Sequence, residues 1–138
     1  MSDPAGELYT AMRAALKADT ALQAAVGSTT VKVYDIPPVN TAGDYIVAGQ
    51  DDVLDVKAEC KSLRETEATV HIWSLTDPPG LVKCKAIGAA VQAVLLALGD
   101  LPSFSMIATE FVRSRYLIDA DGKTAHGVIS VNYTTEPA

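Results

Sequence analysis

FSMIATEFVRSRYLIDADGKTAHGVISVNYTTE (residues 104–136) contains two runs in which apolar and polar side chains alternate, joined by the short polar segment DADGK. Alternation with a period of two predicts β-strands, because successive side chains of a strand point to opposite faces of a sheet. An Asp-Gly pair between two such runs is a strong hairpin signal. The segment therefore predicts a long antiparallel hairpin with strands at 104–118 and 124–136.

Each strand of this hairpin is predicted to present two different faces. In the first strand, one side carries Ile107, Thr109, Phe111, Arg113 and Arg115, and the other carries Met106, Ala108, Val112, Tyr116 and Ile118. In the second strand, one side carries Ile129, Val131 and Tyr133, and the other carries His126, Ser130, Asn132 and Thr134. Strands of this kind pack one face on a core and leave the other to solvent or a partner.

The rest of the chain predicts helices and further strands. Apolar residues at helical spacing predict a helix with a break, or a long and a short helix, over residues 4–26, ended by Gly27. A wider apolar stripe predicts a second helix over 81–98, formed by Leu81, Cys84, Ile87, Val91, Val94, Leu95 and Leu98. Strands are predicted at 31–36, 44–50 and 66–75, the last with Ala68, Val70 and Ile72 opposite Thr69, His71 and Trp73.

The segment 51–65 has many charged residues and few apolar ones. A long mobile hairpin arm or an extended, exposed excursion fits this composition better than a core element.

These elements predict an α+β fold: one domain over residues 1–138, with a two-layer arrangement. A mainly antiparallel sheet of about four to five strands should be covered on one face by two helices. The other face would carry His71, Trp73 and part of the strand at 104–118. An exposed Trp beside polar strand residues is a plausible partner surface.

Composition narrows the class of protein. The 138 residues show no secretory signal and no apolar run long enough to span a membrane. The net charge of −6 argues against strong binding of nucleic-acid phosphates. Without a signal, Cys60 and Cys84 are expected to remain free thiols, with Cys84 buried in the helix and Cys60 more accessible.

The polar clusters do not form a recognisable chemical site. An EF-hand calcium loop with Gly122 at position 6 would place Leu117 and Val128 where oxygen ligands are required, although Asp119 and Asp121 fit. Asp121 and Gly122 are instead expected to make a turn, and Asp119 is free to hydrogen-bond to the backbone of that turn.

The remaining candidates for chemistry are equally weak. His71 and His126 are the only histidines and lie on separate strands, which favours ordinary strand residues over a metal site. No nucleophile motif is present. Arg113 and Arg115 could clamp an anion, but a solvated or inter-subunit ion pair is the more common use of such residues. We therefore assign no catalytic, cofactor-binding or metal-binding residues and expect no cofactor.

The order of several short motifs resembles the tail-completion (tail-terminator) proteins of long-tailed bacteriophages and gene transfer agents. The matching segments are VYD and Pro37 at 33–37, YIV and Gly49 at 45–49, HIWS at 71–74, Ala86 and Ile87, and Asp119, Asp121, Gly122, His126 and Gly127 in the hairpin. The resemblance covers about residues 7–135. The sequence departs from the family pattern mainly at 51–65, a segment that is not informative for the family.

The resemblance implies a structural virion protein and not an enzyme. It implies a homo-oligomeric ring, commonly a hexamer, that caps the tail tube and joins it to the connector or stopper of the head. DNA would only pass through the lumen, and assembly would take place in the host bacterial cytoplasm. The alternatives are another neck or stopper ring component, or a small α+β ligand-binding enzyme with a pocket between sheet and helices.

Overall fold

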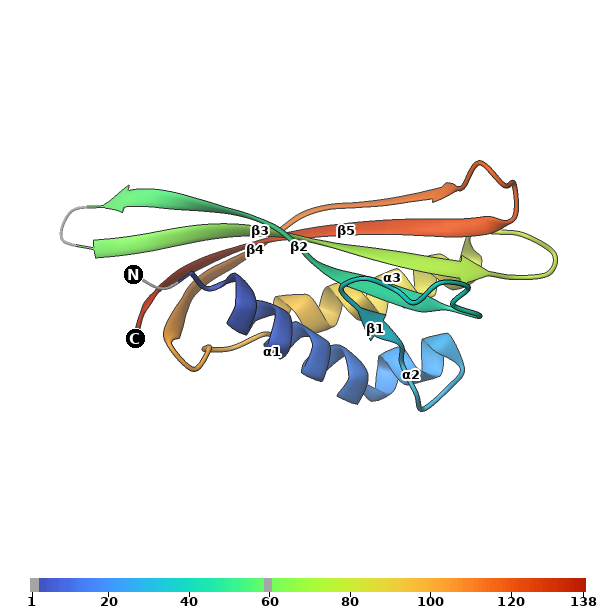
Figure 1. Ribbon diagram of the computed structural model, residues 1–138, viewed down its shortest axis with the longest axis horizontal. Coiled ribbons are helices and arrows are strands. Elements are labelled where there is room, and N and C mark those ends of the chain that lie inside the picture. Colours follow the sequence, from blue (N-terminus) through green and yellow to red (C-terminus); the bar gives the residue numbers. More distant parts are fainter. Residues whose placement is uncertain (1–2, 59–60) are drawn as a thin grey trace.

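A single sheet with helices on one of its faces forms the body of the protein, as the computed structural model shows for residues 3–58 and 61–138 (Figure 1). The helices are α1 (Ala5–Ala18), α2 (Thr20–Val26) and α3 (Val82–Leu96). The strands are β1 (Val33–Tyr34), β2 (Tyr45–Ala58), β3 (Lys61–Leu75), β4 (Phe104–Ile118) and β5 (Thr124–Pro137). The predicted α+β fold is confirmed, with five strands. Cys60 lies outside the described residues.

The sheet has the strand order β1-β2-β3-β5-β4. The four long strands pair antiparallel with their neighbours, and only the short β1 runs parallel to β2. The strand predicted at 31–36 is reduced to two residues, because the chain turns away at Asp35 before Pro37 and Pro38, which cannot donate to a ladder. The long strand β4 therefore forms one edge of the sheet, and β2 forms most of the other.

The N-terminal helical region is a long helix followed by a short one, which was one of the two predicted forms. Asp19 separates them with an extended backbone, and its carboxylate accepts a hydrogen bond of 2.8 Å from the backbone N–H of Leu22. This is a side-chain cap for the start of α2. Gly27 ends α2 with a left-handed φ of 83°, as its position predicts. The buried residues of both helices are Leu8, Met12, Leu16 and Leu22.

Helix α3 packs on the centre of the sheet. The predicted apolar stripe is confirmed, with Cys84, Ile87, Val91, Val94 and Leu95 buried. The approach is close at Gly88, where a Cβ atom would overlap the hydroxyl oxygen of Tyr116 on β4. At Gly127 on β5, a Cβ atom would lie 3.2 Å from the Cys84 sulfur. Residues without side chains at these two positions let the helix and strands approach each other closely.

The predicted faces of β5 are confirmed, whereas the predicted faces of β4 are wrong. On β5, Ile129, Val131 and Tyr133 are buried under the helices. On β4, the register shifts between Met106 and Ala108 and again between Phe111 and Arg113. Each bulge adds a residue and moves the following side chains to the other face.

The consequence is that Phe111 and Arg113 do not share a face as predicted. Phe111 pairs with Val131 on the helix side, and Arg113 pairs with Ser130 on the open side. Arg115 follows Arg113 on the open side, opposite Val128.

Tyr133 should contribute measurably to the free energy of unfolding. Its side chain is fully buried, and its hydroxyl donates a 2.7 Å hydrogen bond to the carbonyl of Leu95 near the end of α3. Replacing Tyr133 with Phe leaves this buried carbonyl without its partner, so the free energy of unfolding should fall by about 1–3 kcal/mol. Urea denaturation of Tyr133→Phe measures the change. Tyr45→Phe, on the open face, is the control and should stay close to wild type; equal losses in both variants would contradict the assignment.

Candidate assembly surface

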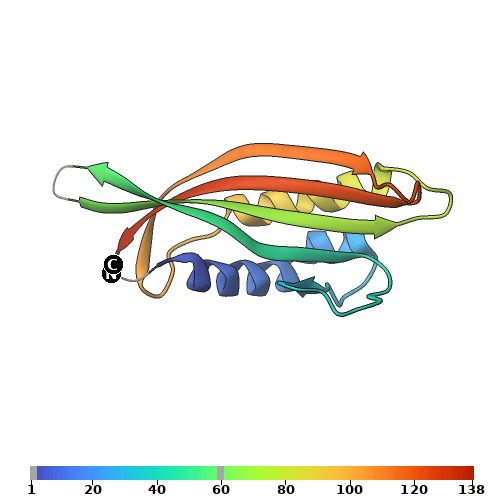
Figure 2. The same ribbon diagram turned by 45° about the horizontal axis from the view of Figure 1, so that its top comes forward.

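The face of the sheet opposite the helices is open (Figures 1 and 2). Residues that pair across neighbouring strands lie in rows on this face. Two such rows near the β4–β5 turn cross all four long strands. One contains Tyr45, Trp73, His126 and Leu117, and the other contains Val47, His71, Val128 and Arg115. The predicted exposure of His71 and Trp73 on this face is confirmed, although both side chains are half-buried by their neighbours.

Trp73 and the two histidines form a stacked cluster in these rows. The rings of Trp73 and His126 stack with centroids 3.8 Å apart and an angle of 8° between their planes. Tyr45 stacks on Trp73 from the other side at 6.5 Å. The cluster borders an open depression of about 320 Å³, whose lining also includes Pro37, Val47 and Gln50.

Hydrogen bonds connect the histidines to Gln50. His71 Nδ1 lies 2.8 Å from His126 Nε2, and His71 Nε2 lies 2.9 Å from Gln50 Oε1. The amide oxygen can only accept, so His71 donates through Nε2 and accepts through Nδ1. His126 then donates from Nε2. Sequence analysis placed the two histidines on separate strands and did not predict that they meet.

Both imidazoles are held in the neutral form. Burial lowers the pKa of His71, and burial together with the neighbouring His71 lowers the pKa of His126, against a smaller opposing effect of Asp119. Two neutral rings bonded to each other and to an amide can present a rigid aromatic surface.

The next rows of the open face carry charge of both signs. Asp52, Glu65, Glu67 and Glu110 surround a depression of about 470 Å³ on β2, β3 and β4. Towards the turn end of β4, Arg113 and Arg115 project from the same face and are exposed. Acidic and basic groups are therefore separated along the sheet, with the arginines at its β4 edge.

Most of the exposed large apolar side chains of the described residues gather in two places. Along β4 they are Ile107, Phe111, Val112 and Ile118. Around the loops at the end of the molecule nearest the β4–β5 turn they are Ile36, Val39, Leu75 and Val82. Sequence analysis did not identify either group, because an exposed apolar residue in a strand or loop has the same local pattern as a buried one.

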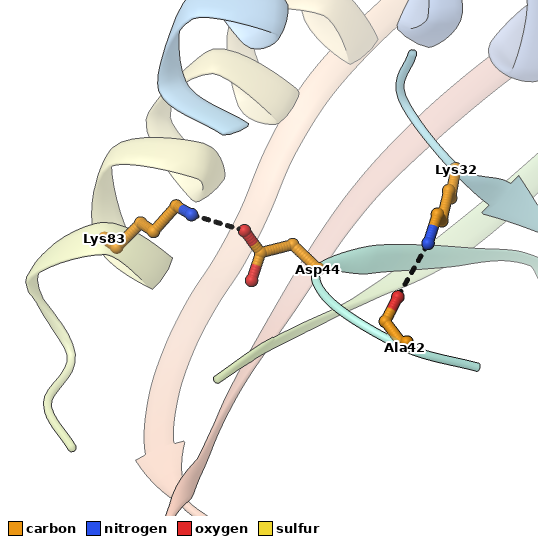
Figure 3. Close-up of polar contacts among 4 residues, drawn as sticks. All are labelled: Lys32, Ala42, Asp44 and Lys83. Carbon is orange, nitrogen blue, oxygen red and sulfur yellow. Dashed lines mark hydrogen bonds and ion pairs between the residues drawn. The ribbon is translucent and has the colours of Figure 1, made fainter. Parts of the chain in front are cut away.

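Two lysines anchor the loop between β1 and β2, which carries Ile36 and Val39 (Figure 3). Lys32 Nζ donates a 2.7 Å hydrogen bond to the carbonyl of Ala42. Lys83, in the first turn of α3, forms an ion pair of 2.6 Å with Asp44. The loop is therefore fixed to the body at the start of β2, while Val39 at its tip is 91% exposed.

The β4–β5 connection is a polar turn, as predicted, but a different carboxylate binds its backbone. Asp121, not Asp119, accepts hydrogen bonds from the backbone N–H groups of Lys123 and Thr124, both at 2.8 Å. A hydrogen bond from the Thr124 hydroxyl, together with these two backbone bonds, lowers the pKa of Asp121 to about 2. Gly122 has the positive φ of 71° that the turn requires.

The segment 51–65 extends β2 and β3. Asp51–Asp55 pair with Arg64–Ala68, and β3 pairs with β5 only from Arg64 onwards. Residues 56–58 and 61–63 therefore extend past β5, and Figure 1 shows this end of the hairpin projecting beyond the helix layer. We refer to residues 56–58 and 61–63 as the arm.

Among the described residues, one gap between the sheet and the helices is narrow. The gap lined by Val26, Val31, Ile46, Ile72 and Ile87 is too small to admit a water molecule. In the described part of the chain, no three His, Cys, Asp or Glu side chains come together as metal ligands. No helix in residues 3–58 and 61–138 is long and apolar enough to cross a membrane.

The histidine pair predicts a specific pH dependence. Folded imidazoles with a lowered pKa bind protons less readily than the unfolded chain, whose histidines titrate near 6.5. The stability they contribute is complete above that pH and is lost as the pH falls below it.

His71→Gln removes a neighbouring ring that competes with His126 for a positive charge, so the pKa of His126 should rise towards its ordinary value. NMR titration of the His126 ring measures this change. Gln50→Ala removes the other hydrogen-bond partner of His71 and no titrating group, so it should leave the His126 pKa nearly unchanged. A His126 pKa that is the same in wild type and His71→Gln would contradict the pairing.

Comparison with known proteins gives a family for this chain. The family model described as "Tail completion protein gp17" matches residues 10–136. No curated protein matches the sequence.

Two solved structures have a similar fold. A chain in the virion of a native gene transfer agent particle superposes with a TM-score of 0.84 at 23% identity, covering 99% of both chains. The bacteriophage SPP1 gp17 protein superposes with a TM-score of 0.58 at 20% identity, covering 94% of this chain and 89% of that one. With the family match spanning nearly the whole sequence, the chain belongs to the gp17 family of tail completion proteins.

Proposed function

We propose that this chain is a tail terminator: a virion protein whose copies form a ring, commonly of six, on the head-proximal end of a tail tube. The ring stops tube growth and provides the docking surface for the head connector or stopper. The observation that carries this proposal is the family match over residues 10–136. The similarity of the fold to a chain of a gene transfer agent virion supports it.

The surfaces of the molecule suit such a role. A cap on a tube must contact its own copies sideways and two different neighbours at its two ends. The end near the β4–β5 turn presents exposed apolar residues, among them Ile36 and Val39 on an anchored loop. The opposite end presents the arm, which carries the exposed cations Lys57 and Lys61. Two chemically different ends fit two different partners, the tail tube protein and the connector.

The charge of the open face fits a channel for DNA. Asp52, Glu65, Glu67 and Glu110 make the middle of this face acidic. If the open face lines the lumen, these carboxylates lower adhesion to phosphates, so DNA slides through without binding. The packed interior between helices and sheet supports a structural role over the enzyme alternative.

Deleting the gene for this chain in cells that produce the particles tests the function. Without a terminator, tubes should continue to grow, so electron microscopy should show tails of excessive and variable length, unattached to heads. Expression of the chain from a plasmid should restore uniform, joined tails. Tails of normal length that fail to attach would instead support the neck or stopper alternative, and normal particles would contradict both.

The extended hairpin should be ordered by a neighbouring molecule. The two strands of the arm pair with each other and extend past β5, and Figure 1 shows this end projecting beyond the helix layer. Hydrogen exchange followed by mass spectrometry should show slower exchange at 51–58 and 61–65 in assembled particles than in the isolated chain. The buried strand segment 128–133 serves as the internal control. Equal protection of the hairpin in both states would contradict a contact there.

A further inference from the structure

The two edges of the sheet differ in charge and are both available for pairing. Figure 2 shows β4 and β2 on opposite long sides of the sheet. Within residues 3–58 and 61–138, β4 pairs only with β5. β1 covers β2 only at Ile46 and Val47, so the outer edge of β2 from Gln50 onwards has no strand partner in the described chain.

We propose that the turn-proximal part of β4, residues 113–118, pairs with the free edge of β2, residues 50–55, of a second copy of this chain. This contact would continue the sheet from one subunit to the next. It rests on the proposed ring and specifies which surfaces form it.

The direction of the strands permits this pairing. β2, β3, β5 and β4 alternate in direction, because each neighbouring pair is antiparallel. With an even number of long strands, β4 and β2 run in opposite directions, so β4 of one copy meets β2 of the next in the antiparallel arrangement. The contact joins two different edges, and such heterologous contacts form a ring where the rotation from copy to copy closes.

The backbone is regular on both sides of the proposed contact. β2 has its irregularity between Val47 and Gln50 and pairs evenly from Gln50 onwards. β4 has its second bulge between Phe111 and Arg113 and pairs evenly from Arg113 to Ile118. Sheets that close require a stagger between strands. A stagger towards the arm brings these two regular stretches together and keeps β4 clear of β1.

Charge favours this half of β4 over the other. Arg113 and Arg115 are exposed on the open face, and neither forms an ion pair with any described residue. The preceding half of β4 carries Glu110 and no cation. On β2 and β3, Asp52 and Glu67 pair across the strands on the same face and are also exposed. Arginine side chains on an adjacent strand are long enough to reach directly opposite and diagonal carboxylates.

The exposed apolar side chains of β4 are consistent with an edge that a second copy of the chain covers. Val112 and Ile118 flank the arginine stretch and are 47% and 37% exposed. A long edge strand with exposed apolar side chains pairs readily with another chain. Pairing would neutralise Arg113 and Arg115 against Asp52 and Glu67. Glu65 and Glu110 would then remain as the unpaired acidic groups of the open face.

Charge reversal tests the contact with two variants that are matched to each other. The first, Arg113→Glu with Arg115→Glu, reverses the β4 edge, and the second, Asp52→Lys with Glu67→Lys, reverses the β2 edge. Each alone places like charges together, so the concentration needed for half-maximal self-association should rise by at least about tenfold. Mixed in equal amounts, the two should associate as well as wild type, because every contact then joins opposite charges in an alternating ring.

Sedimentation velocity over a concentration series measures association, and circular dichroism melting checks that each variant is folded. Arg13→Glu with Lys85→Glu changes two exposed cations on α1 and α3 by the same net charge, and it should associate like wild type. Raising the salt concentration should weaken the wild-type contact.

Several outcomes would overturn this pairing. The first is an unassociated wild type, and the second is normal association of both reversal variants. A third is normal association of the β2 variant alone, since a contact between two β4 strands would leave that variant intact. These outcomes are separate from those of the gene deletion. Tails of uniform length in the absence of this chain would refute the terminator role, even if the two sheet edges pair. Overlong tails would support the terminator role, even if the edges do not pair.

Discussion

The close approach of α3 to β5 is the contact on which the rest of the structure depends. Gly88 and Gly127 remove the side chains that would separate the helix from the strands, and Tyr116 and Cys84 occupy the space between them. The Tyr133 hydroxyl joins the strand to the carbonyl of Leu95. With β5 held in the centre of the sheet, β3 and β4 are placed on either side of it, and all three helices are confined to one face.

That confinement determines what the molecule can do. Because the helices pack on one face of the sheet and bury its middle, the available chemistry lies on the open face, the two edges and the ends. The open face carries a neutral histidine pair stacked on Trp73 and, beside it, separated acidic and basic groups. None of these groups needs a bound ligand to be satisfied, but the edges offer unpaired strand backbone. A protein built in this way is suited to assembly with its own copies and with neighbours.

The elements that could be predicted from the sequence are those whose signal is local. The stripe of α3, the alternation of β3 and β5, and the positive φ of Gly27 and Gly122 follow from spacing and residue type alone. The two bulges of β4 could not be predicted, because they have no composition of their own and arise where the strand is fitted to β5. One shifted residue was enough to place Arg113 on the face opposite Phe111.

The sequence by itself determined the fold class, the faces of the central strands and, through the order of its motifs, the family. These depend on residues close together along the chain, so their pattern can be read before folding. Only the tertiary structure decided that His71 meets His126, that Asp121 binds the turn, and that the charge of the β4 edge is opposite to that of the β2 edge. These features depend on the register between distant strands, which is set by packing over the whole sheet and not by any single segment.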